Sequence, residues 1–308
     1  MKNSIKTALL FLALALVCLG IASCKKTPDA VPEQEQALLF YELEDGNYGV
    51  KAGDDCPEVL IIPESYNGKA VTHVLDAAFE GNSTLKELVL PDSILSVGER
   101  AFANCEALER ITLGNGVKFI GRGAFGNCTA LLTVSIPDNV SELGFGVFAG
   151  CSALESVTIG NGIKTIPHWT FHKCSALRTV TLSEGLNSID PYAFRHCSAL
   201  ESMEIPLGVT NIGGAAFYCC SSLANLSIPS SVTYINNYAF TCCTALTSVT
   251  IPEGVEFIGE QAFAYCTSLT SVNLPNSITH IDKSAFRMSP VLETLLPGNS
   301  ISRPHKDN

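Results

Sequence analysis

Residues 239–261 read AFTCCTALTSVTIPEGVEFIGEQ, and the pattern of these 23 residues recurs along most of the chain. Its most regular element is a phenylalanine that returns every 23 residues, at Phe79, Phe102, Phe125, Phe148, Phe171, Phe194, Phe217, Phe240, Phe263 and Phe286. Each repeat of this length forms one small structural unit, which cannot bury its own apolar side. The sequence therefore predicts a solenoid in which consecutive repeats stack around one continuous core.

The spacing of apolar residues inside the unit predicts its local structure. Phe263, Cys266 and Leu269 follow one another at intervals of three, which places them on one face of a short helical turn. Val249 and Ile251 alternate with polar residues, as in a short strand with one buried face. We expect an α/β repeat solenoid with a parallel β-sheet on one face and short helical turns on the other.

The regular repeats occupy residues 79–291, and both ends of the array depart from the pattern. Residues 38–78 are expected to form an N-terminal cap, with a hairpin around Asp45 and Gly46 and a variant first rung. Residues 292–308 contain two prolines and are expected to form a C-terminal cap and tail. Terminal units of this kind cover the open ends of a solenoid core.

The N-terminal segment reads as an export signal. Residues 1–23 combine a basic start with an apolar run that is too short to cross a bilayer. The run ends in IASC at residues 21–24, which resembles the bacterial lipobox and predicts that Cys24 is diacylated. The alternative is an ordinary cleaved signal with a chance cysteine. Residues 24–37, which are polar and contain proline, are expected to tether the array to the membrane.

The charge of the chain restricts its partners. It carries 30 acidic and 19 basic side chains, for a formal net charge of -11. A surface of this sign repels nucleic acid and anionic lipid headgroups. We therefore expect no nucleic-acid partner, and attachment to a membrane through the lipid anchor only.

The repeat unit AFxxCxxLxxVxIPxxVxxIG, with the segment SYNGKAVTHV at residues 65–74, resembles the BspA-like leucine-rich repeat family of bacterial surface proteins. The resemblance covers about residues 38–301. It implies a leucine-rich-repeat solenoid that is lipid-anchored or secreted, with some relatives implicated in adhesion to host matrix proteins or other cells. The unit lacks the Asn or Cys that follows the strand in the general leucine-rich pattern. No ligand-binding residues can be transferred from the family.

Most of the 13 cysteines have a structural explanation. Eight occupy the inward repeat position, where we expect reduced thiols that fill space as compact apolar groups: Cys105, Cys128, Cys151, Cys174, Cys197, Cys220, Cys243 and Cys266. A line of equivalent positions does not supply the tetrahedral ligands of zinc, so no metal and no other cofactor is expected.

Cys219 and Cys242 are a separate pair, because each precedes the buried column by one residue and they lie one repeat apart. They should be neighbours on the outer face. A disulfide bridge and two partly exposed thiols are the alternatives.

Two surfaces are candidates for binding. The first is the outward strand position, which forms a ribbon of mostly hydroxyl side chains: Thr112, Ser135, Thr158, Thr181, Glu204, Ser227, Thr250 and Asn273. The alternative explanation is the β-propensity of threonine on a solvated sheet.

The second surface comprises aromatic and basic residues flanking the repeat phenylalanines: Trp169, His172, Tyr192, Arg195, His196, Tyr218, Tyr238 and Tyr265. Aromatic and Arg clusters suit protein interfaces and sugar stacking, although such rings can also serve only to cover the solenoid.

No catalytic residues are indicated. His168 and His172 are four residues apart, a spacing that suits a metal on a regular helix, but no further ligand completes the set, and we interpret them as surface histidines. The Ser and Thr residues recur at equivalent positions without a distinctive His and acid partner.

These observations predict a non-enzymatic lipoprotein of the bacterial outer membrane, whose repeat surface binds proteins or glycans. A structural or assembly component of an envelope complex is the alternative.

Overall fold

The structure is a computed structural model that describes residues 37–292. The predicted export signal (residues 1–23), the lipidation site Cys24 and all but the last residue of the predicted tether (residues 24–37) lie outside the described residues. The predicted cap and tail (residues 292–308) also lie outside them, except for the first residue.

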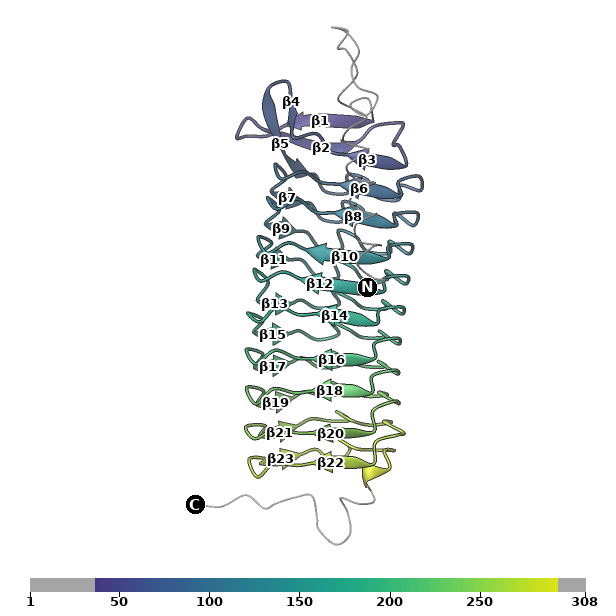
Figure 1. The fold of residues 1–308 in the computed structure, drawn as a ribbon, viewed down its shortest axis with the longest axis vertical. Coiled ribbons are helices and arrows are strands. Elements are labelled where there is room, and N and C mark those ends of the chain that lie inside the picture. The colour runs from purple at the N-terminus through teal and green to yellow at the C-terminus, as the bar shows by residue number, and fades with distance from the viewer. Residues whose placement is uncertain (1–36, 293–308) are drawn as a thin grey trace, which may run out of the picture. The chain divides into compact units, whose positions relative to one another are not determined.

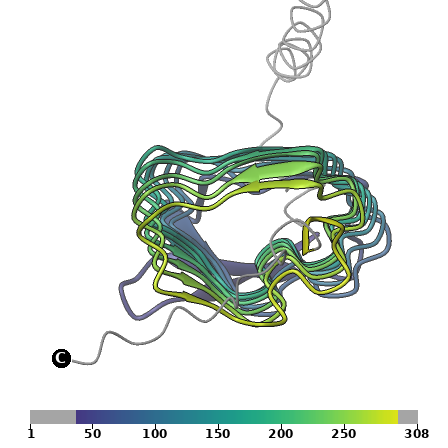
Figure 2. The ribbon, with the colours of Figure 1, turned by 90° about the horizontal axis from the view of Figure 1, so that it is seen from below.

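Each repeat forms one rung of a solenoid, and the rungs follow one another in sequence order (Figure 1). Seen along the stack, the rungs superimpose on a common closed outline (Figure 2). Neighbouring rungs pair in parallel with a register of 23 residues, so that Val134 lies opposite Val157 and Ile235 lies opposite Ile258. Every position of the repeat therefore forms a column that runs along the solenoid.

One face of the solenoid contains the strands that follow the buried leucines. They are β3 (Val59–Ile61), β6 (Glu87–Val89), β8 (Arg110–Thr112), β10 (Thr133–Ile136), β12 (Ser156–Ile159), β14 (Thr179–Thr181), β16 (Ser202–Glu204), β18 (Asn225–Ser227), β20 (Ser248–Thr250) and β22 (Ser271–Asn273). They form three hydrogen-bonded groups, β3 to β14, β16 with β18, and β20 with β22. This face is the parallel sheet that the sequence predicts.

A second face contains mostly shorter strands, which the sequence did not predict except for β2, the second strand of the hairpin expected around Asp45 and Gly46. They are β2 (Tyr48–Ala52), β5 (Lys69–Val74), β7 (Ser96–Val97), β9 (Phe119–Ile120), β11 (Glu142–Leu143), β13 (Thr165–Ile166), β15 (Ser188–Ile189), β17 (Asn211–Ile212), β19 (Tyr234–Ile235), β21 (Phe257–Ile258) and β23 (His280–Ile281). Most of these strands have only two residues, which is too short for an alternating pattern to be recognised. They arise because stacked rungs bring equivalent residues into pairing distance.

The N-terminal end of the stack has its own elements. β1 (Leu38–Glu42) pairs antiparallel with β2, and β4 (Ser65–Tyr66) pairs antiparallel with β5. The rings of Phe40 and Tyr66 stack between these hairpins with their centroids 3.8 Å apart. Together they place side chains and paired backbone over the first rung.

The core is organised around the column of repeat phenylalanines. Consecutive rings are nearly parallel, with centroids 4.9 to 5.8 Å apart, and each ring is at most 2% exposed. Buried Leu, Ile and Val columns lie beside it. This continuity confirms the stacking that the 23-residue period predicts.

The expected helical turns around these phenylalanines are wrong, since the segments around them form turns rather than helix, and the described residues are helical only at Val291 and Leu292. The backbone is left-handed at the second residue before and the second residue after the phenylalanine, as at Arg100 (φ 53°) and Asn104 (φ 60°). Ala103 N–H bonds within its own segment, to Arg100 C=O (3.0 Å), but Phe102 N–H bonds to Ala124 C=O of the next rung (2.7 Å). A helix would keep these bonds within one segment, whereas the solenoid uses alternate N–H groups to join rungs.

The buried cysteines do more than fill space. Each thiol of this column donates a hydrogen bond to the carbonyl of a phenylalanine in an earlier rung, at 3.1 to 3.4 Å. In the last described rung Ser289 Oγ makes the same bond, to Phe263 O (2.7 Å). The cysteines are free thiols, and burial raises the pKa of Cys105 and Cys266 to about 12. They therefore remain protonated donors.

Candidate functional site

The corner of the solenoid that carries the repeat phenylalanines presents two outward columns. We call the second residue before the phenylalanine the leading position and the second residue after it the trailing position. Both have a left-handed backbone in almost every rung. A residue with a Cβ in this conformation costs about 1–2 kcal/mol, and glycine avoids that cost. Some rungs have glycine at the leading position, but Trp169, Tyr192 and Tyr238 place large aromatic rings there.

Six of the eight predicted aromatic and basic residues are brought together at this corner. Trp169 and Tyr192 stack at the leading position of consecutive rungs, with centroids 5.8 Å apart and planes 15° from parallel. The Arg195 guanidinium lies 5.9 Å from the Tyr192 ring centroid and 5.1 Å from that of Tyr218. These contacts join three rungs into one surface.

Two histidines extend this surface along the corner. The His196 ring lies 5.9 Å from His172 and 5.7 Å from Tyr218. Partial burial is the largest cause that lowers the pKa of His172 and of His196, and the positive charge of Arg195 lowers both further. Both rings are therefore neutral near pH 7.

Tyr238 and Tyr265 do not join the group. Tyr238 shares the leading column with Tyr192, but the buried Ala215 separates them, and the Tyr238 hydroxyl donates to Glu260 Oε1 (2.7 Å). Tyr265 is exposed at the trailing position and makes no ring contact within the described residues. Both belong to the solenoid surface apart from the cluster.

The structure adds two residues, Phe145 and His168, that the sequence did not identify as binding candidates; His168 was expected to be only a surface histidine. Phe145 is 52% exposed, and its ring centroid lies 5.3 Å from that of His168. The His168 ring centroid lies 6.0 Å from that of Trp169. His168 Nδ1 lies 3.2 Å from Asp190 Oδ2. Phe145 and His168 both precede the repeat phenylalanine by three residues, a position otherwise occupied mainly by charged and small residues. An aromatic side chain at this repeat position was the sequence signal that could have identified both residues. We define the aromatic cluster as Phe145, His168, Trp169, His172, Tyr192, Arg195, His196 and Tyr218.

A depression of about 540 Å³ adjoins the aromatic cluster on the side of the earlier rungs. Phe145, Trp169 and His172 line it on the cluster side, and the remaining lining is Glu99, Arg100, Ala103, Asn104, Arg122, Gly123, Gly126, Asn127, Gly146 and Ala149. The cluster therefore borders a hollow as well as an open surface.

Cys219 and Cys242 occupy the trailing position of consecutive rungs, as half-buried free thiols. Burial, followed by the charge of Cys242, raises the pKa of Cys219 to about 11. The pair is adjacent, as the 23-residue spacing predicts. A disulfide bridge and two free thiols stay the alternatives for this pair.

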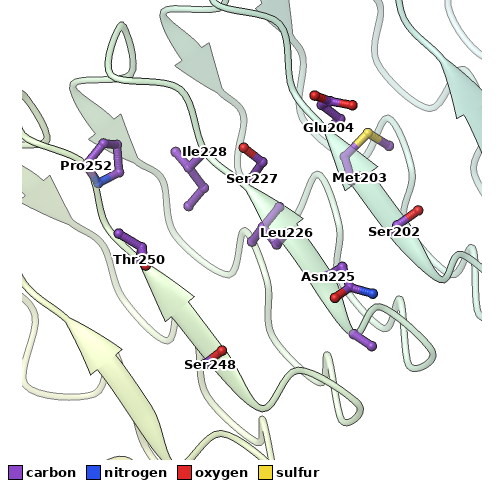
Figure 3. A pocket seen from close by; sticks show the side chains of 11 residues that line it. Ser202, Met203, Glu204, Asn225, Leu226, Ser227, Ile228, Ser248, Thr250 and Pro252 are labelled. Carbon is purple, nitrogen blue, oxygen red and sulfur yellow. The ribbon is translucent and has the colours of Figure 1, made fainter.

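The strand-face ribbon is exposed at all eight predicted positions. Between β16, β18 and β20 the ribbon borders a shallow depression of about 600 Å³, which is lined by Glu204, Ser227 and Thr250 together with the apolar residues Met203, Leu226 and Ile228 (Figure 3). Its lining has small polar side chains and no exposed aromatic ring. The ribbon therefore offers hydrogen bonds but no large apolar anchor.

Neither a metal centre nor a membrane-crossing helix is found in the part of the chain that the structure describes. Among residues 37–292, no three His, Cys, Asp or Glu side chains are grouped so that they could hold a metal ion. The same residues contain no helix long and apolar enough to span a bilayer.

Comparison with known proteins is consistent with this architecture. A family model described as BspA type leucine-rich repeat region matches residues 66–178 and 164–293, with six copies. No curated protein with which the chain was compared matches it.

Several solved structures are similar to the chain. A leucine-rich repeat protein of T. pallidum is 26% identical, with a TM-score of 0.56 over 65% of this chain and 91% of that protein. A leucine-rich cell surface protein of Faecalibacterium prausnitzii is 24% identical, with a TM-score of 0.49 over 87% of this chain and 94% of its own. The first of these likenesses supports a repeat solenoid as the fold.

Proposed function

The chain belongs to the BspA-type leucine-rich repeat family, and from that premise we propose that it is a non-enzymatic binding module, displayed on the bacterial cell envelope, that contacts proteins or glycans through the aromatic cluster. Leucine-rich repeat proteins generally mediate protein binding, and the family consists in general of repeat scaffolds rather than enzymes. Function then depends on the residues that depart from the repeat.

The exposed rings of the cluster carry this proposal. Trp169 and Tyr192 are 43% and 37% exposed, although their left-handed backbone favours glycine. Stacking against each other offsets part of that cost, but a solenoid corner does not need either ring, because Gly123 and Gly146 fill the same position in earlier rungs. Exposed Trp, Tyr and Arg supply much of the energy of protein interfaces. The presence of two large exposed rings at this corner, where glycine also serves, is therefore better explained by binding than by folding.

We also propose that the array is held at the outer membrane by a lipid on Cys24. The support is the short apolar leader that ends in IASC at residues 21–24. Metabolic labelling with a fatty acid should mark the wild-type protein and not a Cys24→Ala variant. Equal labelling of the two would rule out the anchor.

A matched pair of variants tests the binding surface. The mature protein is offered to immobilised matrix proteins and mucin glycoproteins, before and after enzymatic deglycosylation. A Trp169→Ala/Tyr192→Ala variant should bind at least tenfold more weakly than wild type, which corresponds to about 1.4 kcal/mol. Tyr238→Ala is the control, because Tyr238 occupies the same column with the same backbone but lies outside the cluster.

Two results would overturn the proposal. One is wild-type affinity in the double variant with an unchanged circular dichroism spectrum. The other is resistance of the array to protease added to intact cells, together with recovery of a stable complex containing a second envelope protein. That second result would favour a role in envelope assembly over display.

A further inference from the structure

The depression beside the aromatic cluster has an aromatic wall at one end. Tyr192 covers one face of the Trp169 indole. One rung earlier the leading position is Gly146, so no side chain of this column covers the opposite face, and Trp169 lines the depression. Phe145, which is 52% exposed, lines the same hollow. A flat apolar surface is therefore available to a ligand that enters from the side of the earlier rungs.

The lining also includes polar side chains that carry both hydrogen-bond donors and acceptors. Asn127 Nδ2 donates to Asn104 Oδ1 (2.9 Å), which leaves an amide N–H on Asn104 and the carbonyl oxygen of Asn127 without a side-chain partner in the described part of the chain. Within the same residues, Arg122 and Glu99 form no side-chain ion pair and are exposed. Of the two remaining polar residues of the lining, Arg100 is paired with Glu80, and His172 belongs to the aromatic cluster.

The size of the hollow matches a small ligand or the end of a chain. Its volume of about 540 Å³ falls within the range of about 300–1,000 Å³ found for small-molecule sites. Its lining also includes Gly123, Gly126 and Ala149, which have short side chains or none. This part of the lining offers no pocket for the large apolar anchors of a protein partner.

We propose that this depression is a carbohydrate site that takes one or two pyranose rings of a glycan, with the open face of Trp169 as the stacking platform. A pyranose ring has an apolar face of C–H groups and a rim of hydroxyls that both donate and accept hydrogen bonds. The indole matches the face, and Asn104, Asn127, Arg122 and Glu99 match the rim. This inference rests on the proposed binding function and names the ligand class for one part of its surface.

The chain supplies its own reporter for the test, because Trp169 is its only tryptophan. The mature protein is titrated with oligosaccharides of three to four rings, made of glucose, galactose, mannose, N-acetylglucosamine or hexuronic acid. At least one series should change the Trp169 emission saturably, and calorimetry should give the same Kd.

Gly146→Tyr is the decisive variant, since its ring would extend the Trp169 and Tyr192 stack and cover the open indole face. The left-handed backbone strains any side chain here, but the same column already carries tyrosine at Tyr192 (φ 63°) and Tyr238 (φ 61°), and Gly146 has a φ of 62°. A Cβ at Gly146 meets nothing closer than Ala149 Cβ at 3.6 Å. Sugar affinity should fall at least tenfold. Gln261→Tyr adds the same side chain at the same column position (φ 51°), away from the depression, and should bind like wild type.

A second variant keeps the test informative if Gly146→Tyr fails to fold. Arg122→Ala removes an exposed rim group and should also weaken sugar binding severalfold with an unchanged thermal unfolding midpoint. The inference is wrong if no oligosaccharide changes the emission saturably, or if Gly146→Tyr and Arg122→Ala both bind sugar like wild type. If the wild type binds no sugar and Gly146→Tyr no longer binds a deglycosylated protein partner that the wild type binds, the depression is a peptide site instead. In either case, binding of the Trp169→Ala/Tyr192→Ala variant to immobilised partners tests the broader proposed function independently.

Discussion

Truncation of one ring in the phenylalanine column should destabilise the solenoid by an amount that depends on its place in the stack. Phe194 is fully buried, and its ring lies 5.3 Å from Phe171 and 5.2 Å from Phe217. Phe286 is 1% exposed and stacks on Phe263 alone, at 5.5 Å, within the described rungs. Phe194→Ala therefore removes two ring pairs and Phe286→Ala removes one.

The magnitudes follow from burial and from the ring pairs. Replacing a buried Phe by Ala costs about 3–5 kcal/mol, and a stacked aromatic pair contributes about 0.5–1.5 kcal/mol beyond its buried area. We expect a loss of about 4–5 kcal/mol in unfolding free energy for Phe194→Ala. The loss for Phe286→Ala should be smaller by about 1 kcal/mol.

Urea unfolding, followed by circular dichroism and by Trp169 fluorescence, measures both losses. Hydrogen exchange should show reduced protection mainly in the rungs on either side of residue 194, because each rung contacts only its neighbours. A Phe194→Ala loss below about 1.5 kcal/mol, or a loss no larger than that of Phe286→Ala, would refute the stacked-column account.

Three further predictions concern the titratable and thiol groups. Because burial raises the pKa of Cys105 and Cys266 to about 12, iodoacetamide at pH 8 should label the inward cysteine column only after denaturation. The half-buried Cys56 should react faster than that column in the native protein, and native labelling of the column would contradict its burial. Alkylation of the denatured, unreduced protein decides between a disulfide and two free thiols at Cys219 and Cys242, since a bridge leaves both unmodified and modification of both rejects it. Acidification should destabilise the fold through His172 and His196, whose pKa values are lowered in the folded state by burial and by Arg195. The unfolded chain binds protons there first, so stability is retained above pH of about 6.5 and lost as the pH falls below it. The unfolding temperature should therefore drop less between pH 7.5 and 5.5 in a His172→Gln/His196→Gln variant than in wild type, and an equal drop would exclude these two residues as the cause.

Much of the candidate surface could be predicted from the repeat phase, but its shape could not. Trp169, Tyr192 and Arg195 stand out in the sequence because they break the pattern, and the structure places them in contact. The depression beside them arises where side chains are missing, at Gly123 and Gly146, and glycines within a repeat read simply as turn residues. Tyr238 breaks the pattern equally, yet it is separated from the cluster by a single buried alanine.

The sequence by itself determined the solenoid, its register and its core, because a period of 23 residues can bury Phe, Leu and Ile only if equivalent positions stack. It also determined that the cysteines at the inward position are structural. Only the tertiary structure decided the backbone of the corner. A spacing of three residues, as between Phe263 and Cys266, suits a helix and a chain of left-handed turns alike, and the choice depends on where the N–H groups find acceptors. Those acceptors belong to the next rung, as Ala124 C=O does for Phe102 N–H, and no single repeat contains them.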